Sequence, residues 1–330
     1  MSGAAAPVSA RDGRAGLASL RPFIAKYGVI LAMIATFAGF SLAKPDSFFT
    51  VLTLKAIPRD AAPLLVVALG ATVVLVMNEF DLSIGGLLGF AGTFAVVCVS
   101  DAHFGLPVAV SVLLGILFGA ALGLFNGLLI AYAGASSFIV TIGMATVFQG
   151  ADLQVLDQRT IFEGIPDGYV EIAAGTFIGL SNQVFVALAV LAVLWWLLEH
   201  SESGRYMYAI GGNPEAARLS GVRVRALRTF GFVLSGACAG VAGILVSSQA
   251  SAANPNSGLG FLLPAYAAAF LGSTMWRPGI FTAFGTLLGA LFLQIIGTGL
   301  SLFSLSGAIV LMIQGGILVA AVLLSRLGRQ

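Results

Sequence analysis

The sequence predicts an all-α integral membrane protein with about ten transmembrane helices, some of them short or broken. Its 330 residues are 58% hydrophobic and 9% charged, with a mean hydropathy of +1.02, whereas soluble domains carry about 25% charged residues. The apolar residues form continuous runs, whereas the strands of a membrane β-barrel alternate apolar and polar side chains. The 42 glycines suit transmembrane helices that pack closely.

Each predicted span is an apolar run of roughly the length that crosses a bilayer. The spans divide the chain into an N-terminal tail (1–22), a transmembrane domain (23–325) and a C-terminal tail (326–330). The boundaries around 79–86 and 134–137 are the softest, because polar residues and glycines interrupt the apolar runs there. In order, the spans lie near 23–43, 61–78, 82–101, 106–132, 135–150, 183–199, 228–249, 261–275, 280–299 and 303–325.

Basic residues predict the orientation, because cytoplasmic loops accumulate Lys and Arg. If both termini are cytoplasmic, only Lys44, Lys55, Arg59 and Arg159 of the 16 basic residues lie outside. The polar segment 200–227, with five arginines, is then a cytoplasmic loop. The acidic segment 151–182 is the longest external loop and is either a docking surface or a merely solvated connection.

The chain lacks the motifs of an enzyme. It contains no GxxxxGK[ST] phosphate-binding loop, no HExxH or GxSxG motif and no paired His/Cys cluster. We therefore expect no catalytic residue and no metal site. Any directional work must draw on an ion gradient or on another chain.

One interrupted apolar stretch, VLVMNEFDLSIGGLLGF, brings carboxylates close to the spans. It is either a polar turn between two spans or a broken helix that lends polar groups to a solute path. The candidate residues for such a path are Asn78, Glu79, Asp81, Ser83 and Gly85. An ion-coupled transporter would carry more ionisable residues within its spans, so that class is less favoured.

The segment 200–227 contains the signals of a short helix. Asn213 is expected to cap its start, Pro214 to take the first helical position and Gly221 to end it. Such a helix either couples the spans to a soluble partner or simply connects them. The candidate coupling residues are Gly211, Gly212, Asn213, Pro214, Glu215, Ala216, Ala217, Arg218, Leu219, Ser220 and Gly221.

Glycines recur every fourth residue in the predicted span 106–132, which places them along one stripe of a helix. They are Gly115, Gly119, Gly123 and Gly127. The stripe indicates helix packing within the chain or, alternatively, an interface between subunits.

Several of these stretches together resemble a known family. GRYMYAIGGNPEAARLSGVRV, EFDLSIGG, SSFIVTIGMATVFQG and FLGSTMWRPGIFTAFGTLLGALFLQ are similar to segments of the permease subunits of bacterial sugar ABC importers, of the ribose/xylose/galactose type. The resemblance extends over roughly 45–325. It implies that fold, a place in the bacterial inner membrane, and the import of a pentose or hexose.

The resemblance also implies partners. They are two cytoplasmic ATPase subunits, a second permease subunit that is identical or closely related, and a periplasmic or lipid-anchored sugar-binding protein. ATP and Mg would be bound by the ATPase, so this chain is expected to bind no cofactor and no nucleic acid, and to contact membrane lipids. The helix around 213–221 would seat in the ATPase. The cargo could instead be a polyol, a nucleoside or an autoinducer-like solute, and a membrane scaffold without transport is a weaker alternative.

Overall fold

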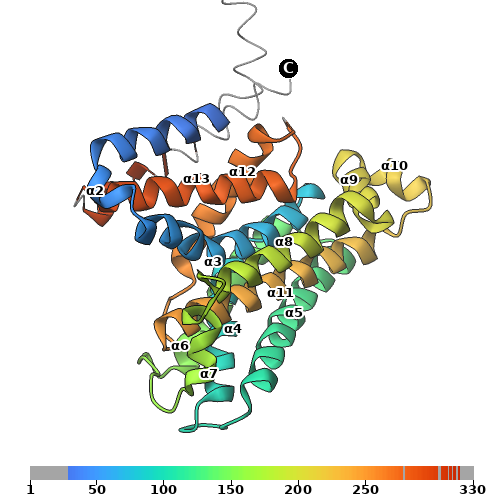
Figure 1. Cartoon of the computed structure of the whole chain (residues 1–330). Helices are drawn as coiled ribbons and strands as arrows, with labels where there is room; N and C mark the ends of the chain where they lie inside the picture. The colour runs from blue at the N-terminus through green and yellow to red at the C-terminus, as the bar shows by residue number, and fades with distance from the viewer. Residues whose placement is uncertain are drawn as a thin grey trace, which may run out of the picture.

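The computed structural model describes residues 29–277, 279–303, 306–310, 312, 313, 315, 316 and 319. The described part is helical apart from loops and one short hairpin, whose strands β1 (Thr176–Phe177) and β2 (Leu180–Ser181) pair antiparallel (Figure 1). Both predicted tails, the start of the first predicted span and most of the last one lie outside the described residues.

The described helices agree with an integral membrane protein. Six are long and apolar enough to cross a bilayer: α3 (Val51–Val76), α5 (Val108–Ala133), α6 (Ser137–Val155), α8 (Asn182–His200), α11 (Val224–Ala250) and α13 (Ala283–Ser301). Shorter apolar helices are Val29–Ala43, α4 (Ile84–Val99) and α12 (Leu262–Met275), which follows the 3₁₀ turn η1 (Leu259–Phe261). In order, they correspond to the first nine predicted spans.

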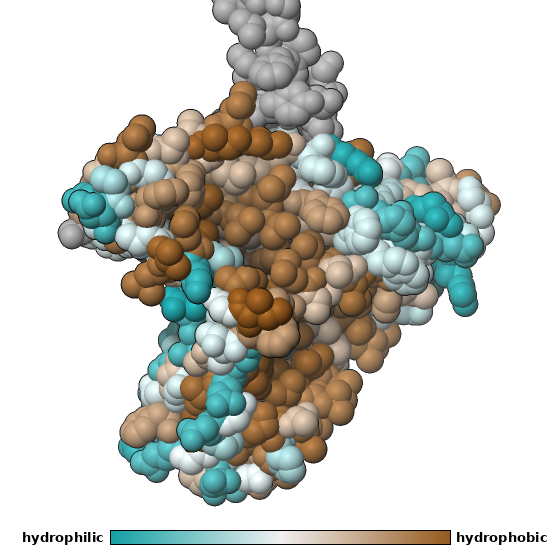
Figure 2. Space-filling view, viewed as in Figure 1, coloured by the Kyte–Doolittle hydropathy of each residue, from teal (hydrophilic) through white to brown (hydrophobic). Residues whose placement is uncertain are grey.

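Polar and apolar residues occupy different parts of the surface, as expected for a protein that spans a bilayer. Short helices α9 (Glu202–Gly212) and α10 (Pro214–Leu219) lie at one end of the bundle, opposite α7 (Asp167–Ala174) (Figure 1). Figure 2 shows hydrophilic residues gathered mainly around these two ends, with hydrophobic surface between them. We refer to these ends below as the α10 end and the α7 end.

The stretch 44–60, which lies between the first two predicted spans, is mostly helical. It contains α2 (Pro45–Phe48), and α3 begins at Val51, ten residues before the predicted span. Within α3, Pro63 has no N–H to bond the carbonyl of Arg59. The structure supplies a substitute donor from another helix: Gln183 Nε2 donates to the Arg59 carbonyl at 2.9 Å. The helix therefore continues through its proline.

The predicted loop 151–182 is also more ordered than a solvated connection. Helix α6 runs on to Val155, five residues past the predicted span end, and α7 packs against α11. Tyr169 of α7 is fully buried, and its hydroxyl lies 2.7 Å from Ser247 Oγ. Ser248 Oγ donates to the Tyr169 carbonyl at 2.7 Å. These contacts fix α7 on the end of α11.

Helix α11 packs closely along α5, and the glycine stripe is the reason. All four stripe residues face α11 of the same chain or its immediate neighbours. A Cβ atom on Gly123 would overlap the carbonyl oxygen of Phe232, and one on Gly119 would overlap that of Gly236. Since α11 covers this stripe, it is not free to form an interface between subunits.

Candidate functional site

The polar segment between α8 and α11 folds into two helices where the sequence predicted one. Ser201 starts α9, and its Oγ accepts a hydrogen bond from Gly204 N at 3.0 Å. Met207 and Ile210 of α9 are buried in the main core. A Cβ on Gly211 would overlap the carbonyl oxygen of Val76, so α9 lies directly against the end of α3. Gly211 and Gly212 therefore belong to α9 and not to the short helix itself, and Gly211 lies against α3.

Helix α10 has the boundaries that its sequence predicted. The side chain of Asn213 accepts hydrogen bonds from the backbone N–H groups of Glu215 and Ala216, both at 3.0 Å. Pro214 occupies the first helical position. The helix ends at Leu219, and Gly221 has a φ of +85°, a conformation that glycine adopts without strain. Capping at both ends makes this six-residue helix more rigid than its length alone would.

The outer surface of α10 carries one charged pair and one large apolar side chain. Arg218 donates two hydrogen bonds to Glu215, from Nε at 3.1 Å and from Nη2 at 2.5 Å. This bond to Arg218 lowers the pKa of Glu215, so the pair is intact at neutral pH and is lost only as the pH falls through that lowered pKa. Leu219 is 78% exposed, whereas Ala217 is buried against the bundle. A capped helix with one protruding leucine suits docking to another protein.

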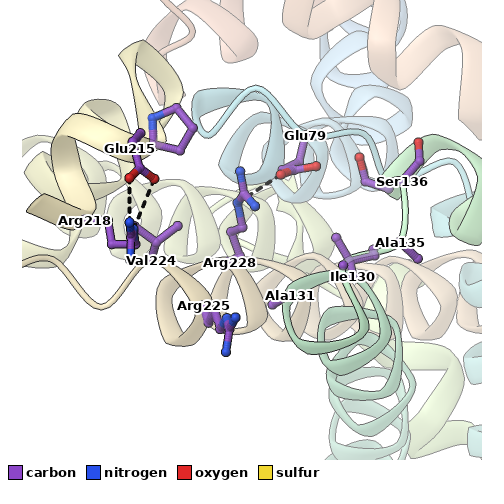
Figure 3. A pocket seen from close by; sticks show the side chains of 13 residues that line it. Glu79, Ile130, Ala131, Ala135, Ser136, Glu215, Arg218, Val224, Arg225 and Arg228 are labelled. Atoms are coloured by element: carbon purple, nitrogen blue, oxygen red, sulfur yellow. Dashed lines mark hydrogen bonds and ion pairs between the residues drawn. The ribbon is translucent and has the colours of Figure 1, made fainter.

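A cleft of about 660 Å³ lies between α10 and the turn from α5 to α6. In Figure 3 the α10 residues line one side of the cleft, and Ile130, Ala131, Ala135 and Ser136 line the other. Glu79 and Arg228 point toward each other between these sides (Figure 3). The cleft therefore joins the exposed helix α10 to the polar stretch that follows α3.

Glu79 and Arg228 connect that polar stretch to α11. Arg228 Nε lies 3.0 Å from Glu79 Oε1, and the two side chains are 27% and 12% exposed, respectively. The contact is an ion pair rather than an aligned hydrogen bond, because Nε has no acceptor in line with its hydrogen. Partial burial reduces screening of this pair by solvent. The pair links the first turn of α11, next to α10, to the non-helical residues before α4.

Asp81 lies deeper and is fully buried. Its carboxylate accepts hydrogen bonds from Ser83 Oγ at 2.5 Å and from Ser235 Oγ at 2.7 Å. Asn126 Nδ2 donates to Ser83 Oγ at 2.8 Å, and the Asp81 backbone N–H donates to Tyr266 Oη at 2.8 Å. The network joins the stretch before α4 to α5, α11 and α12. Residues 77–83 are thus a non-helical segment whose inner part reaches into the bundle, and not a solvated turn.

The five residues proposed for a path do not form one cluster. Asn78, with a φ of +60°, is exposed, and Glu79 faces the cleft. Asp81 and Ser83 belong to the buried network. Gly85 lies against the backbone of Gly258, with the Gly258 carbonyl 3.1 Å from where a Cβ atom would lie.

Sequence patterns did not predict which side chains contact these residues. The contacting residues are Arg228, Ser235, Asn126 and Tyr266. One signal was available, since Asn126 is a polar residue in the middle of a long apolar run. The pairing itself could not be read from the sequence, because each contact joins residues at least 43 positions apart.

The site contains no arrangement that performs chemistry. Within the described ranges, no group of three or more His, Cys, Asp or Glu side chains is placed to hold a metal ion. Cys98 and Cys238 are buried and unpaired by any disulfide. The geometry places α10, the Arg228–Glu79 pair and the buried network around Asp81 close together on one side of the molecule.

Comparison with known proteins indicates a membrane transport protein, in agreement with the apolar helices described above. Residues 53–322 match the family model described as branched-chain amino acid transport system / permease component. The ribose import permease protein of Haemophilus influenzae is 31% identical over 304 residues, which cover 91% of this chain and 93% of that protein. The D-allose transport system permease protein of Escherichia coli K12 is 31% identical over 303 residues, covering 92% of each chain.

A third relative has a different kind of solute in its name. The autoinducer 2 import system permease protein of Photorhabdus laumondii is 31% identical over 278 residues, which cover 84% of this chain and 82% of that protein.

Proposed function

This chain belongs to the family of branched-chain amino acid transport system permease components, and from that premise we propose that it is the membrane-spanning permease subunit of an ATP-driven ABC importer for a monosaccharide. The observation that carries this proposal is α10. It is a capped, exposed helix on the rim of a cleft, and the Arg228–Glu79 pair in that cleft joins α11 to the partly buried polar segment before α4.

The orientation follows from the arginines around α10. Arg205, Arg218, Arg223, Arg225 and Arg228 all lie in or next to this segment, and such residues accumulate on the cytoplasmic side. We therefore place the α10 end in the cytoplasm and the α7 end outside the cell membrane. The protein itself lies in the inner membrane of a bacterium. The transmembrane domain 23–325 then has about ten spans, with the tails 1–22 and 326–330 in the cytoplasm.

Helix α10 is the proposed contact with a cytoplasmic ATPase. Leu219 would enter an apolar pocket on that partner, and the Glu215–Arg218 pair would lie at its rim. ATP and Mg are bound by the ATPase, and no cofactor is assigned to this chain. Movement of α10 would reach residues 77–83 through α9, which lies against the end of α3, and through the Arg228–Glu79 pair. A rigid helix with two such connections transmits displacement better than a flexible loop.

Two further partners complete the proposal. A second permease subunit, identical or closely related, would lie beside this one in the membrane. A soluble or lipid-anchored binding protein would deliver the solute at the α7 end. Because coupling between two sites is reciprocal, the loaded binding protein should stimulate ATP hydrolysis.

The solute class rests on the relatives. Two permeases named for the sugars ribose and allose match this chain over nearly its whole length. A polyol, a nucleoside or an autoinducer-like solute is the runner-up, and the autoinducer 2 relative favours the last of these. Uptake assays distinguish these cargoes.

The test is uptake by cells that express the chain with its ATPase and binding protein. Labelled D-ribose, D-allose, autoinducer 2 and L-leucine serve as probes, the last because of the family's description. We expect accumulation of a sugar that stops when the ATPase phosphate-binding lysine is replaced. Accumulation that persists with the disabled ATPase would refute the ABC mechanism, and accumulation of leucine alone would refute the sugar class.

The role of α10 needs its own variants. Leu219→Asp should abolish co-purification of the ATPase and uptake, because a carboxylate cannot enter an apolar pocket without a partner. Asn213→Ala should weaken both partially, since loss of such a cap costs about 1 kcal/mol. The matched control is Ile178→Asp in the turn between β1 and β2, where the side chain is 81% exposed and distant in sequence from α10; it should leave co-purification of the ATPase unchanged. Normal uptake by Leu219→Asp would contradict the proposed contact.

A further inference from the structure

A second non-helical segment enters the bundle, from the α7 end. Helix α11 ends at Ala250, and regular structure resumes only at η1, after residues 251–258. Ser251 and Asn256 have φ values of +49° and +61°. Helix α12, with 14 residues, is about 21 Å long by its rise per residue, short of the about 30 Å hydrocarbon core of a bilayer. Together with η1 it forms the apolar helix Leu259–Met275, which is still shorter than the about 20 residues of a full span, so residues 251–258 stand where that span would begin. We call them the 251–258 segment.

Specific contacts hold this segment in place. Near the α7 end, Ala253 and Ile161 exchange backbone hydrogen bonds of 2.8 and 3.0 Å. Further in, Gly258 lies against the backbone of Gly85, and a Cβ atom on either glycine would be in close contact with the other. The segment thus runs from the external loop into the interior, where it meets the start of α4.

Asp152 of α6 fixes the middle of the segment. This residue is 2% exposed, and its carboxylate accepts a hydrogen bond from Thr93 Oγ1 at 2.6 Å and another from the Asn256 backbone. The buried carboxylate of Asp152 therefore holds the left-handed backbone of Asn256, while the side chain of Asn256 remains exposed. Fixed backbone with an exposed polar side chain is typical of a binding site.

Gln149 and Asn256 form a polar pair on an open face of the molecule. Gln149 Nε2 donates to Asn256 Oδ1 at 2.7 Å. Gln149 lies six residues from the end of α6, about 9 Å along the helix. Of the six long helices in the described part of the chain, α6 is the least apolar and the least buried, and Thr146 is exposed on it as well.

Lipid is an unfavourable neighbour for this face. Polar side chains and irregular backbone are tolerated at membrane depth only where they are covered by protein or line a water-filled cavity. In the described part of the chain, Gln149 Oε1 and both N–H groups of Asn256 Nδ2 have no hydrogen-bond partner, nor does the second N–H of Gln149 Nε2. A sugar hydroxyl both donates and accepts, so two adjacent hydroxyls of a sugar match these donors and this acceptor.

We propose that Gln149 and Asn256 form a contact site for the hydroxyl groups of the transported solute, on a water-filled path along the open face of α6. The inference rests on the proposed import of a sugar and adds the side chains that the solute meets. One half-buried and one exposed amide bind weakly, which suits a path because a solute must leave as readily as it enters.

The first test asks whether the face is in water, whatever the solute. Cys98 and Cys238 are replaced by Ala, and single cysteines are introduced as Gln149→Cys, Asn256→Cys and, as a lipid-facing control, Val193→Cys. Spheroplasts expressing each variant with the partner chains are treated with a membrane-impermeant cationic methanethiosulfonate. We expect labelling at 149 and 256 at least ten times faster than at 193. Labelling at 149 no faster than at 193 would overturn the inference.

The second test measures uptake of D-ribose, D-allose and autoinducer 2 by Gln149→Leu, with Gln154→Leu as the control. Gln154 is exposed on α6 but about 140° around the helix from Gln149. We expect Gln149→Leu to raise the KM for uptake at least fivefold while binding-protein-stimulated ATP hydrolysis persists, and Gln154→Leu to leave the KM within twofold. An unchanged KM in Gln149→Leu would overturn the site while leaving the importer function intact.

The experiments distinguish a failure of the proposed solute class from a failure of the proposed contact site. If the wild-type chain accumulates none of the three solutes, the proposed solute class is wrong, and the labelling rates still show whether the α6 face is in water. If the wild-type chain accumulates one of them, the importer function holds and the Gln149 variants decide the site.

Discussion

Replacing Asp81 by Asn should loosen the inner end of the stretch between α3 and α4. Asp81 is fully buried and accepts hydrogen bonds from two serine hydroxyls and from the backbone N–H of Ser83. Asn has nearly the same shape, so the change alters the charge and one hydrogen-bonding group while keeping the volume. The Asn amide would direct a donor at Ser235 Oγ, which donates to the carboxylate in the native protein.

The magnitude follows from these contacts. A hydrogen bond to a charged group contributes about 1.5–3 kcal/mol, against about 1 kcal/mol for a neutral pair. Asp81→Asn keeps an acceptor for one serine hydroxyl and turns a donor toward the other, so we expect a loss of about 1–3 kcal/mol. Asp81→Ala leaves both hydroxyls without an acceptor and should cost about 3–6 kcal/mol, taking 1.5–3 for each bond.

Thermal unfolding in detergent, followed by loss of the monodisperse peak on size exclusion, measures this effect. Each kcal/mol should lower the apparent Tm by about 2–4 °C. Asp157→Asn is the control, because Asp157 is exposed and lies 3.9 Å from Arg159 in a pair of the kind that contributes little. An Asp81→Asn protein that melts within 1 °C of wild type, the order of effect seen for neutral surface changes, would refute the reasoning about the network. Normal uptake by that variant would show that the network does not organise transport.

Three more outcomes follow from the structure. Glu79→Gln should destabilise the protein by about 1–3 kcal/mol, because it leaves the charge of Arg228 unpaired. The double variant Glu79→Gln/Arg228→Gln should recover part of that loss in a double-mutant cycle, and strict additivity would contradict the pairing. Gly123→Val should lower the yield of folded protein, since overpacking costs about 1–3 kcal/mol, whereas Gly143→Val, with open space at its Cβ position, should not; equal yields would contradict the α5–α11 packing. In vesicles, Leu219→Asp should give uptake indistinguishable from vesicles that lack the ATPase, and uptake at the wild-type rate would exclude α10 as the coupling element.

Local sequence signals predicted the elements that local physics controls. The Asn213-Pro214-Glu215 start and the Gly221 end of α10 were placed correctly, because a cap and a left-handed glycine act over a few residues. The segment that became α9 was read as part of a loop. Its helix depends on burial of Met207 and Ile210 against the bundle, which no local signal reports.

Helix α3 shows the same kind of failure, because the predicted spans left residues 44–60 as a connection. Nothing local in the sequence indicates that α3 begins at Val51 and passes through Pro58 and Pro63. The helix runs through them because Gln183, more than a hundred residues later in the chain, donates to the carbonyl that Pro63 leaves without a partner. A contact over that distance is set by the fold.

The amino-acid sequence by itself determined that this chain is a membrane protein, where its apolar runs lie and which short segment stands out in water, because hydrophobicity and charge act on each segment independently. Only the tertiary structure decided that Asp81 is buried between two serines and that Glu79 meets Arg228. It also decided that the 251–258 segment contacts the start of α4 through Gly258 and contacts α6 through the Gln149–Asn256 pair. These contacts join residues far apart in the chain, and the packing of glycine-lined helices is what brings them together.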